Sequence, residues 1–282
     1  MELSDTQSEA DTRGVRINRV GVRGLKYPAC IDGMATVAVF SLSVDLPANQ
    51  RGTHMSRFVA LLQEHHDRLR AGDMVDLVRK LRRRLGATAA YLQVEFPWFH
   101  EKQAPVSGEP GMMDYSVRWD IHVQGRQSDF AVTVRIPIGT LCPCSKAISE
   151  RGAHNQRGEA TLTVRSSPPA AIVQMVYLVE SSASSELYSL LKRTDEKFVT
   201  EQAYDNPAFV EDVVRQIALK MATIRGLQSY RIEVENFESI HNHNAFAVIE
   251  ETRPVGKPRC ASARREGKPG KAGGRSRAGS SG

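Results

Sequence analysis

Two cysteines and a histidine lie close together near the middle of the sequence. The stretch Leu141-Cys-Pro-Cys-Ser-Lys146 holds Cys142 and Cys144, and His154 follows in Gly152-Ala-His-Asn-Gln-Arg157. Thiolates and imidazoles are ligands that zinc and related divalent metals accept. One cysteine and one histidine leave a metal site incomplete, because a catalytic site needs a third protein ligand and an open position for water.

Two later segments offer the missing ligand and the groups that would move protons. The first is the turn Asp195-Glu196-Lys197, and the second is the cluster Glu238-Ser-Ile-His-Asn-His243. A bound divalent metal lowers the pKa of its water, and neighbouring carboxylates and imidazoles would transfer the protons. Cys144 cannot easily share one ion with Cys142 across the intervening proline, so it could instead act as a proton donor or nucleophile.

Each of these residues also has an ordinary structural interpretation. A structural metal site would serve as well as a catalytic one for the Cys-Pro-Cys loop with His154. Composition alone favours ordinary roles for Glu196 and Glu211, since a carboxylate in the first turn of a helix is stabilised by the helix dipole. We interpret Cys30, Cys260 and most of the eight histidines as packing or surface residues. Chemistry is therefore favoured first for the Cys-Pro-Cys loop.

The elements that must position these residues follow from apolar periodicity. Period-two alternation predicts strands, and apolar residues three and four apart predict helices. The expected strands cover 15–24, 35–46, 89–96, 115–124, 130–138, 159–164, 230–237 and 245–250, and the expected helices cover 55–63, 74–85, 170–192 and 207–225. The order strand, strand, helix, helix, strand, strand occurs twice, which indicates two similar modules in tandem. Neighbouring strand pairs favour an α+β fold of antiparallel sheets backed by helices.

One helix has clear start signals. Asn206 is expected to cap it, Pro207 suits the first helical position, and an apolar stripe follows. The segment at 101–112, with its prolines and glycines, is expected to be a loop.

Composition is that of a globular protein, with 41% hydrophobic and 25% charged residues among 282. The polar, acidic start lacks an apolar run behind a basic head, and no stretch is long and apolar enough to cross a bilayer. We therefore expect a cytoplasmic protein with no membrane partner. Four cysteines, two of them separated by one residue, do not resemble a secreted disulfide framework.

The positive charge lies at one end of the chain. Residues 253–282 contain nine Lys/Arg and one Glu, against a formal net charge of +6 for the whole chain. This Gly-, Ser- and Pro-rich tail cannot bury enough apolar surface to fold, so we predict a disordered basic tail at 253–282 and a disordered leader at 1–14. The tail could contact nucleic acid only nonspecifically, through counterion release.

Six motifs in order resemble those of GTP cyclohydrolase IB, and the resemblance extends over roughly residues 14–252. They are Leu141-Cys-Pro-Cys-Ser-Lys146, Gly152-Ala-His-Asn-Gln-Arg157, Lys192-Arg-Thr-Asp-Glu-Lys197, Val199-Thr-Glu-Gln-Ala-Tyr204, Asn206-Pro207 with Phe209-Val-Glu-Asp212, and Ser239-Ile-His-Asn-His243. The resemblance implies a tunnelling fold (T-fold) with modules at 15–125 and 126–252, the second carrying most site residues. It also implies a homotetramer, a dimer of dimers, whose barrels hold active sites at subunit interfaces.

The family's activity gives roles to the residues of the metal and base sites. It converts GTP and water to 7,8-dihydroneopterin triphosphate and formate, the first step of folate-type pterin synthesis, by metal-assisted opening of the guanine imidazole ring. By position, Cys142, His154 and Glu196 resemble the ligands of a zinc, manganese or iron ion. Glu211 resembles the group that anchors the guanine edge, where a carboxylate accepts the N–H donors of N1 and the 2-amino group.

The remaining roles concern protons and the triphosphate. The residues that resemble the acid and base groups are Cys144, Glu238 and His241, with His243 as a further candidate. Lys146 and Arg157 are predicted to contact the triphosphate, because phosphates favour cationic donors.

Three alternatives stay open at this point. A related cyclohydrolase of the same fold could make a different pterin product, which product analysis would separate. A nonenzymatic polyanion-binding protein would use the basic tail and a structural metal site, and would show salt-dependent binding. A thiol oxidoreductase ranks last, because Cys142 and Cys144 are one residue too close for a Cys-x-x-Cys motif.

Overall fold

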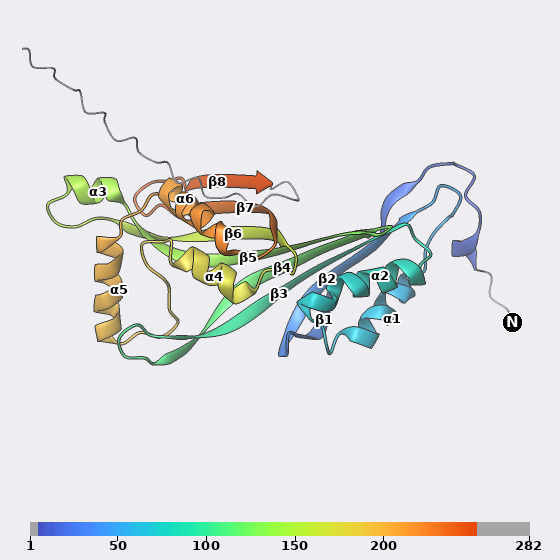
Figure 1. Ribbon diagram of the computed structural model, residues 1–282, viewed down its shortest axis with the longest axis horizontal. Coiled ribbons are helices and arrows are strands. Elements are labelled where there is room, and N and C mark those ends of the chain that lie inside the picture. The colour runs from blue at the N-terminus through green and yellow to red at the C-terminus, as the bar shows by residue number, and fades with distance from the viewer. Residues whose placement is uncertain (1–4, 253–282) are drawn as a thin grey trace, which may run out of the picture.

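One eight-stranded antiparallel sheet organises the computed structural model, which describes residues 5–252 (Figure 1). Each strand pairs with its neighbours in sequence, in the order β1 to β8. The strands are β1 (Ile17–Ile31), β2 (Met34–Leu46), β3 (Ala89–Gln103), β4 (Pro110–Gln124), β5 (Gln127–Leu141), β6 (Asn155–Ser166), β7 (Leu227–Asn236) and β8 (Ala245–Thr252). The expected α+β class is confirmed; the tail at 253–282 and the first four residues of the leader lie outside the described residues.

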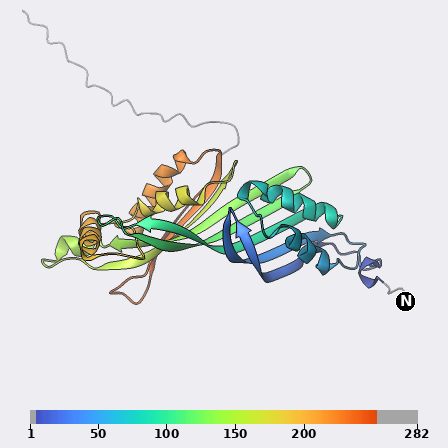
Figure 2. The same ribbon diagram turned by 90° about the horizontal axis from the view of Figure 1, so that it is seen from below.

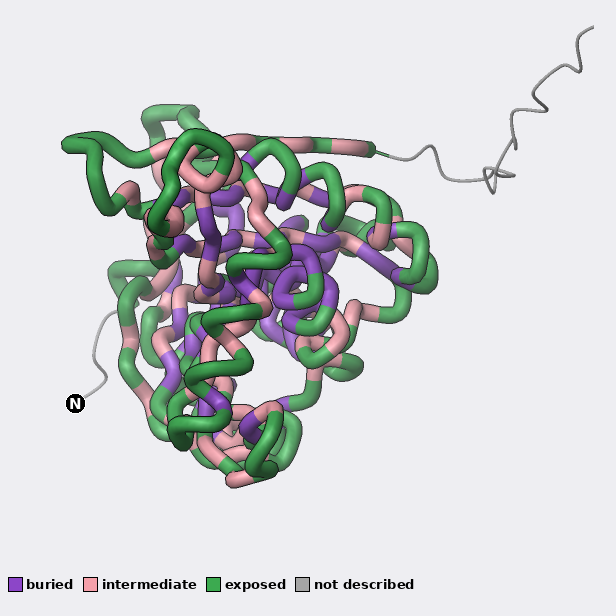
Figure 3. The backbone as a smooth tube through the Cα atoms, turned by 90° about the vertical axis from the view of Figure 1, so that its left-hand side faces the viewer, coloured by how far each residue is buried: buried purple, intermediate pink, exposed green. Residues whose placement is uncertain are grey.

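Alternation along the strands gives the sheet one buried and one polar face. In β4, Val117, Trp119 and Ile121 are buried, whereas Arg118 and Asp120 between them are only half-buried. Successive side chains of a strand point to opposite faces, so this pattern turns the apolar set toward the helices. Figure 3 shows buried segments gathered at the centre of the molecule and exposed ones around them.

Four helices cover the apolar face (Figures 1 and 2). They are α1 (Met55–His65), α2 (Met74–Arg84), α4 (Ile172–Glu180) and α6 (Val210–Lys220). Helix α2 packs on β3 and β4, α4 packs on β5, and α6 packs on β7 and β8. Each helix turns a stripe of buried apolar residues toward the sheet, as its periodicity predicts. No helix within residues 5–252 is long and apolar enough to span a membrane.

Two further helices were not expected from periodicity. Helix α3 (Pro143–Ile148) follows β5, and α5 (Arg193–Asp205) lies between α4 and α6. Only Asp195 and Ala203 are buried on α5, so its sequence has no apolar stripe to reveal it. The helix expected over 170–192 is wrong beyond Glu180, where α4 ends.

The expected cap of the following helix is also wrong. Asn206 ends α5 instead, and its Nδ2 donates a hydrogen bond to the Gln202 carbonyl at 2.9 Å. Helix α6 begins at Val210, and the Phe209 N–H donates to the Asp212 carboxylate at 3.1 Å. The Asp212 carboxylate thus accepts the backbone N–H of Phe209, the residue before α6, while the Asn206 side chain bonds to the end of α5.

Two segments expected to be irregular are ordered. The loop expected at 101–112 is mostly hairpin, because β3 and β4 pair as far as Gln103 and Pro110. Part of the expected disordered leader is also held in place, since the Asp11 N–H donates to the Asn49 carbonyl and the Gly52 N–H donates to the Gln7 carbonyl. Backbone pairing, which apolar periodicity does not report, orders both segments.

Candidate active site

A cavity of about 570 Å³ opens beside α3, at the start of α6 and along the connection between β7 and β8. It lies at the end of the second half of the sheet. Seven of the predicted site residues line it: Cys142, Cys144, His154, Glu211, Glu238, His241 and His243. Segments far apart in sequence thus deliver thiols, imidazoles and carboxylates to one place.

Cys142 and His154 are brought together by the antiparallel pairing of β5 and β6. The pairing ends at Leu141 and Asn155, and the Cys142 N–H donates to the His154 carbonyl at 3.1 Å. Ser145 ties the loop further, because its Oγ donates to the Cys142 carbonyl at 3.1 Å and accepts from the His154 N–H at 3.2 Å. The Cys142 Sγ accepts the Ser145 N–H at 3.5 Å, which orients the thiol at the start of α3.

Among residues 5–252, the hydrogen bonds of the His154 ring are made at Nδ1. Its Nδ1 lies 2.9 Å from Gln156 Oε1 and 3.2 Å from Ser239 Oγ. An amide oxygen only accepts hydrogen bonds, so this network assigns the proton to Nδ1 and leaves the Nε2 lone pair for a ligand. Histidines that bind metals are oriented in this way.

Glu211 reaches the cavity because the segment before α6 is tied to the end of β5. The Ala208 N–H donates to the Leu141 carbonyl at 3.1 Å, and Glu211 lies in the first turn of α6. The positive end of the helix dipole favours a carboxylate there. The dipole therefore stabilises the Glu211 charge at the cavity wall.

The connection between β7 and β8 supplies the remaining titratable groups. In this segment Glu238 is half-buried, whereas His241 and His243 are exposed, and the two imidazole rings stack with centroids 5.2 Å apart. The Asn244 side chain donates to Glu235 at 2.7 Å and fastens the end of the connection to β7. These groups line the same cavity as Cys142 and His154.

Three predicted residues do not line the cavity. Glu196 is exposed in the first turn of α5, and Arg157 is exposed on β6. The Lys146 ammonium donates to the Tyr204 carbonyl and lies 4.1 Å from the centroid of the Tyr204 ring. Within the described part of the chain, no three His, Cys, Asp or Glu side chains converge closely enough to hold a metal ion. Cys142 and His154 fit a divalent metal by donor type and orientation, but a single chain does not place Glu196 beside them.

Sequence reasoning missed one buried polar residue of the cavity. Asn236 is only 3% exposed, and its Oδ1 has no hydrogen-bond partner among residues 5–252. It follows Ile232 and Val234 on the buried face of β7, so a polar residue in an apolar alternation was the available signal. A Cβ on Gly158, its partner on β6, would lie 2.8 Å from Asn236 Oδ1, so glycine leaves room for the amide.

The Asn236 Oδ1, unpaired among residues 5–252, indicates a place where a ligand would donate a hydrogen bond. A buried acceptor without a donor costs roughly 1–3 kcal/mol, so natural proteins seldom leave one unpaired. Asn236 lines the cavity, where a bound molecule could supply the donor. Gln156, which orients His154, is the second residue that the sequence analysis did not single out as a site residue.

Comparisons with known proteins show the family of the chain. Residues 3–247 match the family described as "Type I GTP cyclohydrolase folE2". The chain is 52% identical over 257 residues to "GTP cyclohydrolase FolE2" of Akkermansia muciniphila, covering 88% of this chain and 97% of that one. It is 48% identical over 254 residues to the protein of the same name from Bordetella petrii, covering 88% and 96%.

Among solved structures, the chain resembles the uricase from Arthrobacter globiformis. The TM-score is 0.50 at 6% sequence identity, over 86% of this chain and 96% of that one. At this identity the likeness concerns the fold alone, and it supports an antiparallel sheet backed by helices.

Proposed function

The chain belongs to the type I GTP cyclohydrolase family FolE2, and from that premise we propose that its cavity converts GTP and water to 7,8-dihydroneopterin triphosphate and formate. It is an enzyme of the first step of folate and pterin biosynthesis, acting on GTP. The observation that carries the assignment to this cavity is the convergence of seven predicted site residues on its walls.

Cys142 and His154 are the proposed metal ligands of each chain. The thiol is oriented by the Ser145 N–H, and the imidazole presents Nε2 because Gln156 and Ser239 engage Nδ1. These two side chains would hold a divalent ion, which would supply the activation of water for attack on the guanine C8 atom. Zinc, manganese and iron all accept this donor set.

The third proposed ligand, Glu196, comes from a neighbouring copy. In its own chain Glu196 is exposed on α5, outside the cavity, while Asp195 beside it is buried. An exposed carboxylate on a helix with few buried residues is available to a second subunit. Glu196 of the partner subunit would complete a site to which one chain contributes only two ligands.

Glu211 is the proposed anchor of the guanine base. Its two carboxylate oxygens would accept the N1–H and the 2-amino N–H, and Glu211 lines the cavity. Asn236 Oδ1 is the proposed acceptor for a further N–H of the bound substrate, since it is buried there without a partner in residues 5–252. Together these two residues would hold the base in one orientation.

Cys144, Glu238 and His241 are the proposed residues that transfer protons, and His243 is a further candidate. Opening the imidazole ring requires a proton delivered to a ring nitrogen and others removed from water, so several titratable groups must face the base. These four residues line the same cavity as Cys142 and Glu211. Lys146 and Arg157, sequence neighbours of lining residues, remain the proposed contacts of the triphosphate.

The proposed assembly is a T-fold homotetramer, a dimer of dimers, built from modules at 15–125 and 126–252. Within the described sheet β8 pairs on one side only. Among residues 5–252, the outer edge of β1 is free except at its end, where the Cys30 N–H donates to the His66 carbonyl and the Leu69 N–H donates to the Cys30 carbonyl. Both strands therefore have an edge to offer another copy. Barrels closed in this way would place active sites between subunits.

A mixing experiment tests the shared site. GTP turnover, followed by formate and pterin fluorescence, is measured on metal-stripped protein with zinc, manganese or iron restored. Cys142→Ala and Glu196→Ala chains should each be inactive alone, and mixed assemblies should recover about a quarter of wild-type activity, as random pairing of two chains across one interface dictates. No recovery in stable mixed assemblies would place Glu196 in the same chain's site, and no turnover with any metal in folded wild-type protein would overturn the function.

A further inference from the structure

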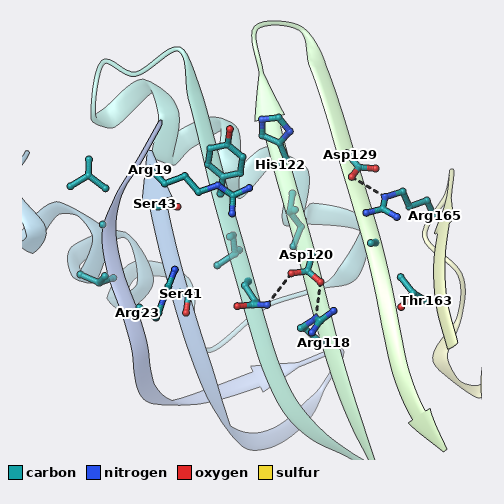
Figure 4. A pocket seen from close by; sticks show the side chains of 18 residues that line it. Arg19, Arg23, Ser41, Ser43, Arg118, Asp120, His122, Asp129, Thr163 and Arg165 are labelled. Atoms are coloured by element: carbon teal, nitrogen blue, oxygen red, sulfur yellow. Dashed lines mark hydrogen bonds and ion pairs between the residues drawn. The ribbon is translucent and has the colours of Figure 1, made fainter. Parts of the chain in front are cut away.

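A second cavity, of about 720 Å³, lies on the face of the sheet that carries no helices (Figure 4). It spans β1 to β6, and none of its lining residues lines the candidate active site. Its polar walls come from the strand positions that alternate with the core, such as Ser41 and Ser43 between Phe40, Leu42 and Val44. We call it the arginine hollow, after Arg19, Arg23, Arg118 and Arg165 on its walls.

Two of these arginines are held by carboxylates through one nitrogen each. Arg118 Nε donates to Asp120 at 2.8 Å, and Arg165 Nε donates to Asp129 at 3.0 Å (Figure 4). Within residues 5–252 these are the hydrogen bonds that the two guanidinium groups make, so their terminal N–H groups stay available. The aspartates thus fix the direction of each guanidinium and leave its outer donors for a ligand.

The other two arginines have no carboxylate partner in the described part of the chain. The Arg19 guanidinium lies 3.9 Å from the ring centroid of Tyr91, and Arg23 is exposed on the same strand. Burial and the neighbouring Arg19 lower the pKa of His122, so this imidazole adds no charge at neutral pH. Four arginines against two aspartates leave the hollow with an excess of positive charge.

The aromatic side chains of the hollow are already engaged. Tyr91 stacks on His122 with centroids 4.3 Å apart and planes at 2°, and Arg19 lies over the Tyr91 ring as well. A base entering the hollow would find no free tyrosine face. Recognition there must depend on charge and hydrogen bonds.

We propose that the arginine hollow binds an oligophosphate, separately from the active site. Guanidinium groups match phosphate oxygens in pairs, and preoriented arginines lose less freedom on binding than free ones. The volume lies in the range of small-molecule sites. Because no base is recognised, inorganic tripolyphosphate binds as well as a nucleoside triphosphate does, and a nucleoside without phosphate does not compete.

Titration calorimetry with tripolyphosphate on the full-length protein tests this. The test variant is Arg19→Gln with Arg23→Gln, because neither arginine leaves a carboxylate unpaired when removed. The matched control is Arg126→Gln, which removes an exposed arginine from the turn between β4 and β5, outside the hollow. The basic tail is the same in all three proteins, so any binding to it cancels in the comparison.

We expect the double variant to bind tripolyphosphate at least about tenfold more weakly than wild type and the control, while GTP turnover stays at the wild-type level. ATP should displace tripolyphosphate and guanosine should not. Equal affinity in all three proteins, or displacement by guanosine, would overturn the proposal. Turnover is measured at the other cavity, so failure here leaves the cyclohydrolase assignment untouched.

Discussion

The two halves of the sheet share a plan, yet only the second holds the candidate active site. Strands β1 and β2 are joined by the tight turn Asp32-Gly33, whose two residues have positive φ angles of 48° and 89°. The corresponding connection from β5 to β6 is longer and carries α3 with Cys142 and His154. Likewise α4 and α6 are separated by the segment that contains α5.

The difference shows that the candidate site residues lie in the connections between elements rather than in the repeated strands and helices. The repeated part, four strands and two helices, uses mainly apolar residues to build its core, and its buried carboxylates Asp45 and Glu180 form ion pairs with Arg16 and Lys102. The inserted connections meet at one end of the second half and bring the reactive groups together. Rigid elements thus position loops that carry function.

The largest expected effect is a loss of GTP turnover when a cysteine of the second half, but not one of the first half, is replaced. Cys142→Ala should lower GTP turnover more than about 100-fold, because it removes a proposed metal ligand. Cys30→Ala, at the end of β1 in the first half, should leave turnover within about twofold. Steady-state assays with matched circular dichroism spectra check both, and equal losses in the two variants would contradict the contrast.

A core substitution in the first half should affect stability and spare chemistry. Phe58 is fully buried on α1, so Phe58→Ala should lower the free energy of unfolding by about 3–5 kcal/mol. Activity per folded molecule, measured well below the unfolding midpoint, should be unchanged. Urea denaturation measures the first quantity, and a large loss of activity in fully folded variant would show that the halves are more tightly coupled than proposed.

In the second half, Gln156 offers a test of how His154 is oriented. Gln156→Ala removes the acceptor for the His154 Nδ1 proton, so zinc affinity should fall about 10- to 100-fold. Competition with a chelator measures the affinity. Gln156→Glu keeps an acceptor at this position and should restore most of it; unchanged affinity in Gln156→Ala would mean that Ser239 alone suffices.

Replacing Asn236 should lower activity and spare stability, the reverse of what is expected for Phe58. Asn236→Leu replaces an amide whose Oδ1 has no partner in residues 5–252, so stability should not fall, while kcat/KM for GTP should drop about tenfold. Asn236→Asp, which keeps an acceptor, should lose less. Reduced stability with normal kcat/KM would assign Asn236 to the fold rather than to the substrate.

The smallest effect is a loss of stability in acid, and it concerns Asp195, whose carboxylate binds α5 to the turn between β3 and β4. Burial raises the pKa of Asp195, but hydrogen bonds from Ser107, Lys192 and Val106 outweigh it and hold the pKa well below its usual value. This stabilisation is present above pH of about 4, the usual unfolded value, and is lost as pH falls below it. Asp195→Asn should therefore approach wild-type stability on acidification, whereas parallel pH curves would exclude the effect.

Much of the fold was predictable because apolar alternation reports which face of an element is buried. All eight strands and the four helices of the core were expected near their observed positions. Helix α5 was not predicted, because hydrogen bonds between Asp195 and the 104–109 turn hold it in place rather than an apolar stripe that the periodicity could show. Contacts between distant segments are invisible to local periodicity.

The candidate site was predictable as a set of residue types and motifs, but not as an arrangement. The sequence analysis predicted seven residues that line the cavity, six of them within the motifs, and it also predicted Glu196, which lies outside the cavity of its own chain. Motif order does not say which chain supplies a side chain. Asn236 was missed because its importance comes from burial without a partner, which only three-dimensional packing reveals.

The order of the strands has a consequence for how the protein is made. Every strand pairs with the one synthesised just before it. During translation each new strand can add to a growing edge, and no strand has to wait for a partner that the ribosome has yet to produce. The first half can thus form its hairpins before the loops of the candidate active site leave the ribosome. Part of the sheet can therefore be folded before the site residues are synthesised.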